Sequence, residues 1–193
     1  ETIAVTALPD GEAWYAYSVR VMTTTDMTPK AIHDLGQSEV KRIRKEMDEV
    51  IAKTGFKGTF QEFCEFLRTD PQFFYDKPED LLRGYRDIAK RIDPELMKLF
   101  GKLPRVPYGV IPIRSYSEKS QTTAYYQPGS PSGRPGYFYA NLYDLKTRPK
   151  WEMEALTVHE AVPGHHIQIS IAQELENVPE FRKWNRYTAF VEG

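Results

Sequence analysis

The sequence predicts a predominantly helical α+β fold with a small antiparallel sheet late in the chain. Apolar residues recur at helical spacing through the first hundred residues and again near the end of the chain. Between them, residues 103–143 are rich in proline and tyrosine, a composition typical of extended segments and loops. Helical runs separated from extended runs in this way indicate an α+β domain.

The first hundred residues are expected to form helical support. Thr28 followed by Pro29 is a strong helix start, because threonine caps the N-terminus and proline suits the first helical position. Thr59 and Glu62 have the capping-box spacing that starts a second helix. Residues 9–25 fit either a strand or a short helix. The helices predicted in this half span residues 28–55, 59–68, 78–92 and 94–100.

Residues 1–102 are thus predicted as support, and residues 103–193 as a small sheet plus metal-site helices, in one continuous catalytic domain truncated at both ends. Two aromatic-rich strands, 122–127 and 136–143, flank a loop that is rich in glycine and proline. The second strand is the natural exposed edge, where an extended peptide could add to the sheet. Helices are then predicted from near Pro149 or Lys150, over residues 167–177, and from Pro179 to Gly193.

The motif H-E-A-V-P-G-H-H, residues 159–166, holds three of the four histidines of the chain. Imidazoles bind zinc and neighbouring transition metals, and a carboxylate beside a ligand can activate water at the metal. The motif is close to the zincin signature H-E-x-x-H, in which two histidines four residues apart share one helix face. Here Pro163 stands at the position of the second histidine. The sequence therefore predicts a zincin-like zinc site of altered spacing.

Pro163 should interrupt the helix that carries His159, because proline lacks the N–H for the helical hydrogen bond and clashes with the preceding turn. Gly164 supplies the permissive backbone that a local bulge needs. Looping out Pro163 and Gly164 restores the four-residue spacing and brings His165 to the metal, whereas choosing His166 would require three residues to be looped out. We therefore favour His165 as the second ligand and keep His166 as an alternate ligand or oxyanion donor.

A third protein ligand is expected, since catalytic zinc sites use three and leave one position open. Glu192 is the preferred candidate, because it follows an apolar run and should lie against the core. A carboxylate there is costly unless it is paired or bound to a metal. The alternatives, which stand in polar surroundings, are Glu174, Glu176 and Glu180.

Glu160 is predicted to be the general base, taking a proton from water and passing it to the leaving nitrogen. The oxyanion needs a further donor. Tyr126, Tyr139 and His166 are the preferred candidates, and the other available donors are Tyr125, Tyr137 and Arg134. The residues expected to contact substrate are Tyr125, Arg134, Tyr137 and Asn141, with Asn141 fixing a backbone group. In the alternative interpretation the tyrosines simply cover the sheet.

Several stretches together resemble a known family. The motif, the preceding S-G-R-P-G-Y-F-Y-A-N and the closing F-V-E-G are similar to the bacterial domain-of-unknown-function 885 family, and the resemblance extends over nearly the whole chain. It implies a zinc metallopeptidase with Glu192 at the third-ligand position of glutamate zincins. It also implies a longer protein, since F-V-E-G normally runs on into W-A-L-Y, and a periplasmic, secreted or lipid-anchored bacterial location.

The composition narrows the classes of protein to which the chain could belong. The net charge of −1, from 26 basic and 27 acidic residues, gives no electrostatic footprint for nucleic acid. Cys64 is the single cysteine, so no internal disulfide can form, and no apolar run approaches the roughly 20 residues of a membrane span. The leading hypothesis is a zinc-dependent hydrolase of peptides. Its rivals are a zinc amidase or other hydrolase of a small non-peptide substrate, and a non-catalytic metal-binding module.

Overall fold

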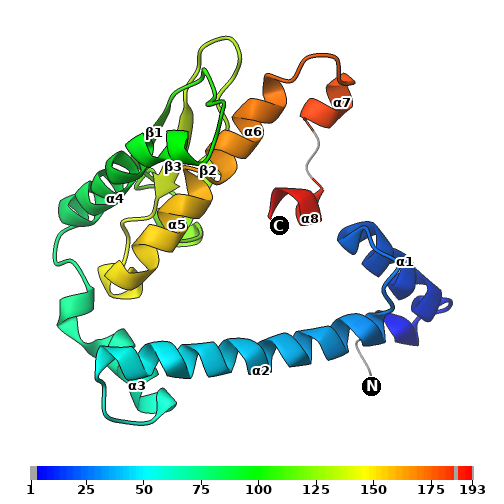
Figure 1. Cartoon of the computed structure of the whole chain (residues 1–193), viewed down its shortest axis with the longest axis horizontal. Helices are drawn as coiled ribbons and strands as arrows, with labels where there is room; N and C mark the ends of the chain where they lie inside the picture. The colour runs from blue at the N-terminus through cyan, green and yellow to red at the C-terminus, as the bar shows by residue number, and fades with distance from the viewer. Residues whose placement is uncertain (1–3, 185–186, 193) are drawn as a thin grey trace. The chain divides into compact units, whose positions relative to one another are not determined.

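Helices dominate the structure, a computed structural model that describes residues 4–184 and 187–192 (Figure 1). One small sheet accompanies them, so the α+β class predicted from the sequence is confirmed at this level. Parts of the predicted last helix, residues 185–186 and 193, lie outside the described residues.

The chain divides into two compact units: Glu1–Glu65 with Arg186–Gly193, and Phe66–Asn185. This division differs from the predicted boundary at residue 102. The reason is packing, since helix α4 (Pro78–Ile92) lies against both the sheet and helix α5 (Met153–Glu160) and so belongs with them.

The first unit consists of helices whose starts follow from their capping residues. Its elements are η1 (Val5–Ala7), α1 (Gly11–Thr23), α2 (Pro29–Thr54), the first part of α3 (Phe60–Thr69) and α8 (Thr188–Val191). Thr28 caps α2, its hydroxyl accepting from the Ala31 N–H at 3.2 Å. The capping box of α3 also forms, because the Thr59 N–H donates to Glu62 Oε2 at 2.7 Å and the Glu62 N–H donates back to Thr59 Oγ1 at 3.3 Å. The ambiguous segment 9–25 is resolved as a helix.

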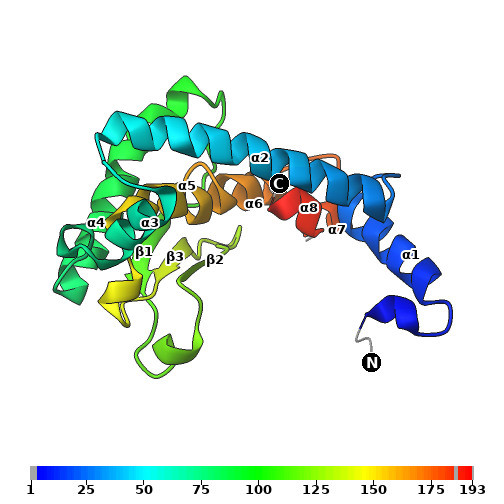
Figure 2. The ribbon, with the colours of Figure 1, turned by 90° about the horizontal axis from the view of Figure 1, so that it is seen from below.

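The second unit places helices on one face of a three-stranded sheet (Figures 1 and 2). Its strands and α-helices are α4, β1 (Tyr108–Pro112), β2 (Ala124–Gln127), β3 (Gly136–Ala140), α5, α6 (His165–Gln173) and α7 (Glu180–Lys183). Its 3-10 turns are η2 (Pro71–Phe73), η3 (Asp93–Lys98), η4 (Glu118–Ser120), η5 (Leu145–Thr147) and η6 (Lys150–Glu152). Phe138 of β3 is fully buried against Tyr85 of α4, with ring centroids 5.1 Å apart, and Met153 and Ala161 join the same core. This core fixes α5, which carries the first half of the motif.

The sheet is mixed, so the prediction of an antiparallel sheet is wrong. Its strand order is β1-β3-β2, with β1 parallel and β2 antiparallel to β3. The stretch expected to be the exposed edge, G-Y-F-Y-A, is therefore the central strand. Residue composition shows that a segment is extended, but the direction and order of pairing depend on contacts between distant segments.

Two predicted helices differ from those observed. Residues 94–100 do not form an α-helix, because the chain leaves α4 as the 3-10 turn η3, in which Pro94 cannot donate a backbone hydrogen bond. The predicted C-terminal helix is represented by two short helices, α7 and α8, rather than one.

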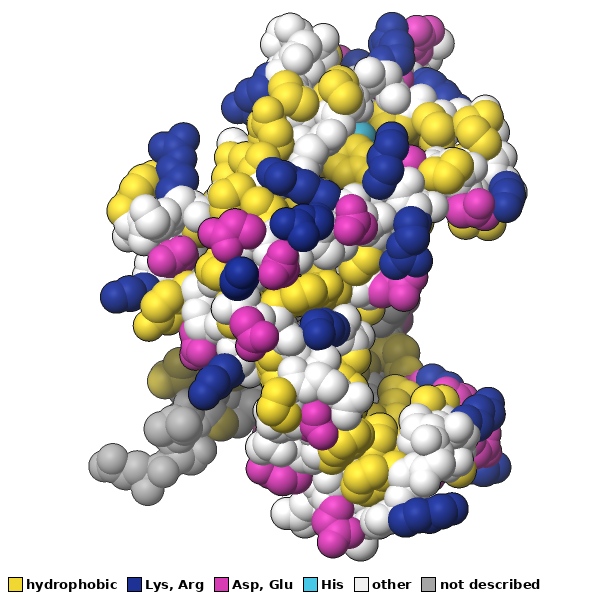
Figure 3. All heavy atoms as spheres, turned by 90° about the vertical axis from the view of Figure 1, so that its left-hand side faces the viewer, with side chains coloured by type: hydrophobic (Ala, Val, Ile, Leu, Met, Phe, Trp, Pro, Cys, Tyr) yellow, Lys and Arg dark blue, Asp and Glu magenta, His cyan; other side chains and the backbone are white. Residues whose placement is uncertain are grey.

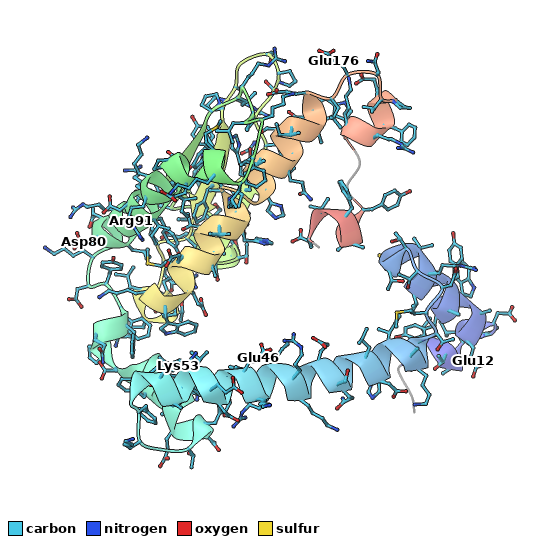
Figure 4. The ribbon with its side chains drawn as sticks, viewed as in Figure 1. Glu12, Glu46, Lys53, Asp80, Arg91 and Glu176 are labelled. Carbon is cyan, nitrogen blue, oxygen red and sulfur yellow. The ribbon has the colours of Figure 1, made fainter. Side chains whose placement is uncertain are left out.

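The surface is charged in a balanced way. On the face drawn in Figure 3, basic and acidic side chains are interspersed, in line with the net charge of −1. Figure 4 labels charged side chains that extend away from their own helices, such as Glu46 on α2 and Asp80 and Arg91 on α4. Among the described helices, none combines the length and the apolar character that crossing a membrane requires.

Candidate metal centre

The motif forms a break between α5 and α6, so the predicted interruption at Pro163 and Gly164 is confirmed. The Gly164 N–H donates to the Val158 carbonyl at 2.8 Å. In a continuous α-helix this carbonyl would instead accept from the residue four positions later. The ladder of hydrogen bonds therefore skips two residues, the number that the sequence predicts, and Figure 1 shows α6 continuing roughly along α5.

Glycine is required at position 164 because backbone carbonyl groups lie very close to its Cα. A Cβ there would clash with the carbonyl oxygens of Val158 and His159, because the turn folds tightly back onto the end of α5. The preceding Val162–Pro163 peptide bond is cis. The tight turn thus depends on Gly164, in the stretch where this motif departs from the ordinary zincin spacing.

The skip brings His159 and His165 together. Their ring centroids lie 4.5 Å apart with an interplanar angle of 68°, and one ligand nitrogen of each lies within 4.8 Å of the other. His159 is exposed and His165 half-buried, so both rings remain accessible from solvent. Two nitrogens bound to one tetrahedral zinc stand roughly 3.4 Å apart, from Zn–N bonds of about 2.0–2.1 Å. Small side-chain rotations would therefore suffice, and the donor set fits zinc.

Glu160 lies at the end of α5, between the exposed His159 and the core. Its side chain is only 8% exposed, and the next two residues, Ala161 and Val162, are fully buried. A carboxylate in such surroundings is largely removed from water.

His166 points the other way, into the interior. It is 2% exposed, and its Nδ1 lies 2.8 Å from the Tyr126 hydroxyl and 3.4 Å from Ser170 Oγ. Burial lowers the pKa of its imidazole to about 4, while a hydrogen bond to the Val106 backbone and the charge of Asp93 act in the opposite direction. His166 is therefore neutral at pH 7 and belongs to a buried network.

Tyr126 is the partner of His166 on the sheet. Burial raises the pKa of its hydroxyl, so it stays protonated at neutral pH. The hydroxyl fits because Gly136, on the neighbouring strand, leaves room that a Cβ would fill. We therefore assign Tyr126 and His166 to positioning the start of α6, and the direct catalytic roles expected from the sequence stay predictions.

The other predicted tyrosines share the opposite face of the sheet from Phe138, as alternation along a strand requires. Tyr125 and Tyr139 are paired across β2 and β3 and stack with centroids 4.8 Å apart, while Tyr137 meets Tyr139 edge-on at 6.1 Å. Arg134 closes the hairpin loop by donating from Nη2 to the Pro128 carbonyl at 3.2 Å.

The predicted substrate-binding role of Asn141 is wrong. Its side chain is 1% exposed and lies inside the protein. Its Nδ2 donates to the Glu118 and Thr122 carbonyls at 2.7 and 3.1 Å, and its Oδ1 accepts from the Tyr143 N–H at 2.9 Å. With its donor and acceptor both engaged, Asn141 holds the loop before β2 rather than a substrate.

The glutamates also differ from expectation. Glu192 follows α8 in the first unit and is exposed, so the expected burial against the core is not found. Glu174, expected in polar surroundings, has a side chain only 5% exposed and accepts from the Arg105 N–H at 2.7 Å. The sequence around Glu174 is polar, and its partner lies 69 residues away, so no local signal marks its burial.

Fold and turn together define a helical α+β protein with an accessible histidine pair at an interrupted helix. The family described as "Bacterial protein of unknown function (DUF885)" matches residues 1–193, and the chain belongs to this family. No protein with a curated description matches it.

Among solved structures, the chain is similar to the crystal structure of the "putative lipoprotein" from Colwellia psychrerythraea. The two share 28% sequence identity with a TM-score of 0.91. The match covers 98% of this chain and 33% of the other, so the chain spans about a third of that protein's length.

Proposed function

We propose that this chain carries the metal centre of a zinc-dependent hydrolase that cleaves peptide bonds. One observation carries the proposal: the hydrogen-bond ladder skips two residues and thereby pairs His159 with His165, beside Glu160. The pairing supports a zincin-like chemistry in a chain whose motif lacks the ordinary spacing.

The proposed ligands are His159, His165 and Glu192. Two imidazoles and one carboxylate form the donor set of glutamate zincins, which leaves a fourth position for water or substrate. A bound zinc ion supplies Lewis-acid activation of a water molecule and of the substrate carbonyl. Glu192 is proposed as the third ligand because of its place in the sequence, directly after the apolar run that ends at Val191.

Glu160 is proposed to move the proton. Its carboxylate accepts a proton from the attacking water and delivers it to the leaving nitrogen as the C–N bond breaks. The buried neighbours Ala161 and Val162 restrain its solvation and fix its position. Tyr126 and His166 hold the first turn of α6, so that His165 stays opposite His159.

The stacked tyrosines of the sheet are proposed to contact substrate. Tyr125, Tyr137 and Tyr139 are half-buried and offer flat aromatic surfaces for peptide side chains. Tyr139 lies on the face of the sheet opposite to Phe138 and the helices, so only a contact with substrate is proposed for it, while Arg134 stays a candidate contact for a substrate carboxylate.

The test is a substitution that separates metal binding from turnover. In the full-length protein, Glu160→Gln should retain one zinc and lose at least about 100-fold in kcat on peptides, because general-base catalysis contributes about 10²–10⁴-fold. Glu154→Gln, an exposed position on the same helix, is the matched control and should keep both. Normal peptide turnover by Glu160→Gln would refute the mechanism even if zinc is found.

The rival functions give different results in the same experiment. A non-catalytic metal-binding module would hold zinc with no turnover by the wild-type protein. A zinc amidase would hydrolyse small amides and leave peptides intact, with the same sensitivity to Glu160→Gln. Comparing peptide and small-amide substrates therefore separates all three.

We further propose that the protein is exported and held at a bacterial membrane or secreted. The support is the similarity of the chain to a protein described as a "putative lipoprotein", at 28% identity. Cell fractionation checks it, since the proposal predicts recovery outside the cytoplasm.

A further inference from the structure

A cavity lies next to the α5–α6 turn and is distinct from the histidine pair. Its volume is about 290 Å³, at the small end of ligand sites. Val162 and His166 contribute to its wall, whereas His159 and His165 are not among the described residues that line it. The cavity therefore shares a segment with the proposed metal centre but opens elsewhere.

The walls are apolar and well supported. Leu96, Val162 and Ile167 form one hydrophobic cluster, and each is no more than 6% exposed. The extended segment 103–108 closes the other side. Glu174 holds this segment to α6 through its bond with the Arg105 N–H. The cavity is thus built from fixed elements and suits a hydrocarbon group.

The cavity carries one negative charge from Asp93. Asp93 Oδ1 accepts from the Tyr108 hydroxyl at 2.7 Å, and Oδ2 meets Lys90 Nζ at 3.3 Å. Lys90 is 84% exposed, so solvent screens that ion pair strongly. Among the described residues, no lysine or arginine lines the cavity.

These features select one class of ligand. An anion would meet the Asp93 carboxylate with no basic side chain from the lining to offset it. An ammonium group can pair with the Asp93 carboxylate through a charge-assisted hydrogen bond. The volume limits the rest of the ligand to a short alkyl chain or a single aromatic ring.

We propose that this cavity binds a small primary amine with an apolar body, its ammonium at Asp93 and its hydrocarbon between Leu96, Val162 and Ile167. The amine is either a free alkyl or aryl amine or the amino terminus of a peptide that begins with an apolar residue. Amine binding at this site needs no metal, so it can be tested independently of the proposed hydrolase function.

Calorimetric titration of the full-length, zinc-free protein tests the proposal. Phenethylamine should bind at least tenfold more tightly than 2-phenylethanol or 3-phenylpropionate, which have similar shapes without the positive charge. Phenylalanylglycinamide distinguishes the sources: if it binds as well as phenethylamine the ligand is a peptide terminus, and if it does not the ligand is a free amine. Equal binding of all three phenyl compounds, or no binding, would overturn the proposal.

Two variants locate the binding. Asp93→Asn keeps an acceptor for the Tyr108 hydroxyl but removes the charge, so phenethylamine affinity should fall at least tenfold while 2-phenylethanol affinity stays the same. Leu103→Trp fills the cavity and should abolish binding of both compounds. Asp87→Asn, an exposed carboxylate on α4, is the matched control and should bind as the wild type does. Unchanged phenethylamine affinity in Asp93→Asn would contradict the assignment.

Discussion

His165 and His166 are neighbours in the sequence and point to different sides of one helix start. His165 is half-buried and faces His159 across 4.5 Å, whereas His166 is 2% exposed and bonded to Tyr126 at 2.8 Å. His165, on the accessible side of the turn, can bind a metal together with His159. His166, on the buried side, holds the turn in place through its bond to Tyr126. The number of residues looped out before the pair decides which histidine faces which way.

The largest expected effect comes from closing the bulge. Gly164→Ala places a Cβ against the carbonyl oxygens of Val158 and His159, so it should lower the free energy of unfolding by about 3 kcal/mol or weaken zinc binding by at least tenfold as the turn shifts. Gly101→Ala meets no atom within 4 Å and should change stability by less than about 0.5 kcal/mol. Chemical denaturation and zinc titration of both variants measure this. A Gly164→Ala protein that is normal in both respects would show that the tight turn is dispensable.

The buried side should make stability depend on pH. The pKa of His166 is lowered to about 4 in the folded chain, from about 6.5 when unfolded, so the unfolded chain binds more protons between these values. Stability is therefore complete above about pH 6.5 and is lost as pH falls toward 4, by about 2–3 kcal/mol. Denaturation of zinc-free protein across this range measures the loss.

His166→Asn is the control for that pH dependence. Asparagine can still bond to Tyr126 but does not titrate, so the loss between pH 6.5 and 4 should become smaller by the same amount. An unchanged pH profile in this variant would mean that another group carries the dependence.

A smaller effect is expected at Asn141. Asn141→Ala removes bonds to the Glu118 and Thr122 carbonyls, and should cost about 1–2 kcal/mol of stability. Because Asn141 is buried and engaged in these bonds, KM for peptide substrates should stay unchanged in the folded variant. Steady-state kinetics at a temperature where the variant is folded checks this, and a raised KM would restore the substrate role that the structure argues against.

Features that depend on neighbouring residues could be predicted from the sequence. The capping of α2 by Thr28 and the capping box at Thr59 involve atoms within one turn, and both form. The break at Pro163 and Gly164 follows from the covalent chemistry of those two residues alone. Even the count of two skipped residues could be worked out, because it concerns a single helix.

Features that depend on distant contacts could not be predicted. The bond between Tyr126 and His166 joins residues 40 apart, and that between Arg105 and Glu174 joins residues 69 apart. The parallel pairing of β1 with β3 is likewise invisible to local patterns. The sequence therefore suggested a catalytic role for His166 and a substrate contact for Asn141. In the structure both side chains are buried and hold neighbouring segments in place.

Zinc titration of the full-length protein against a competing chelator tests the central claim most directly. The wild type should bind one zinc, His165→Ala should lose at least about 100-fold in affinity, and His166→Asn should lose less than His165→Ala, within the about 10–100-fold range of groups that support a ligand without binding the metal. If His166→Asn loses the metal while His165→Ala retains it, the accessible and buried sides of the turn have been assigned the wrong way round.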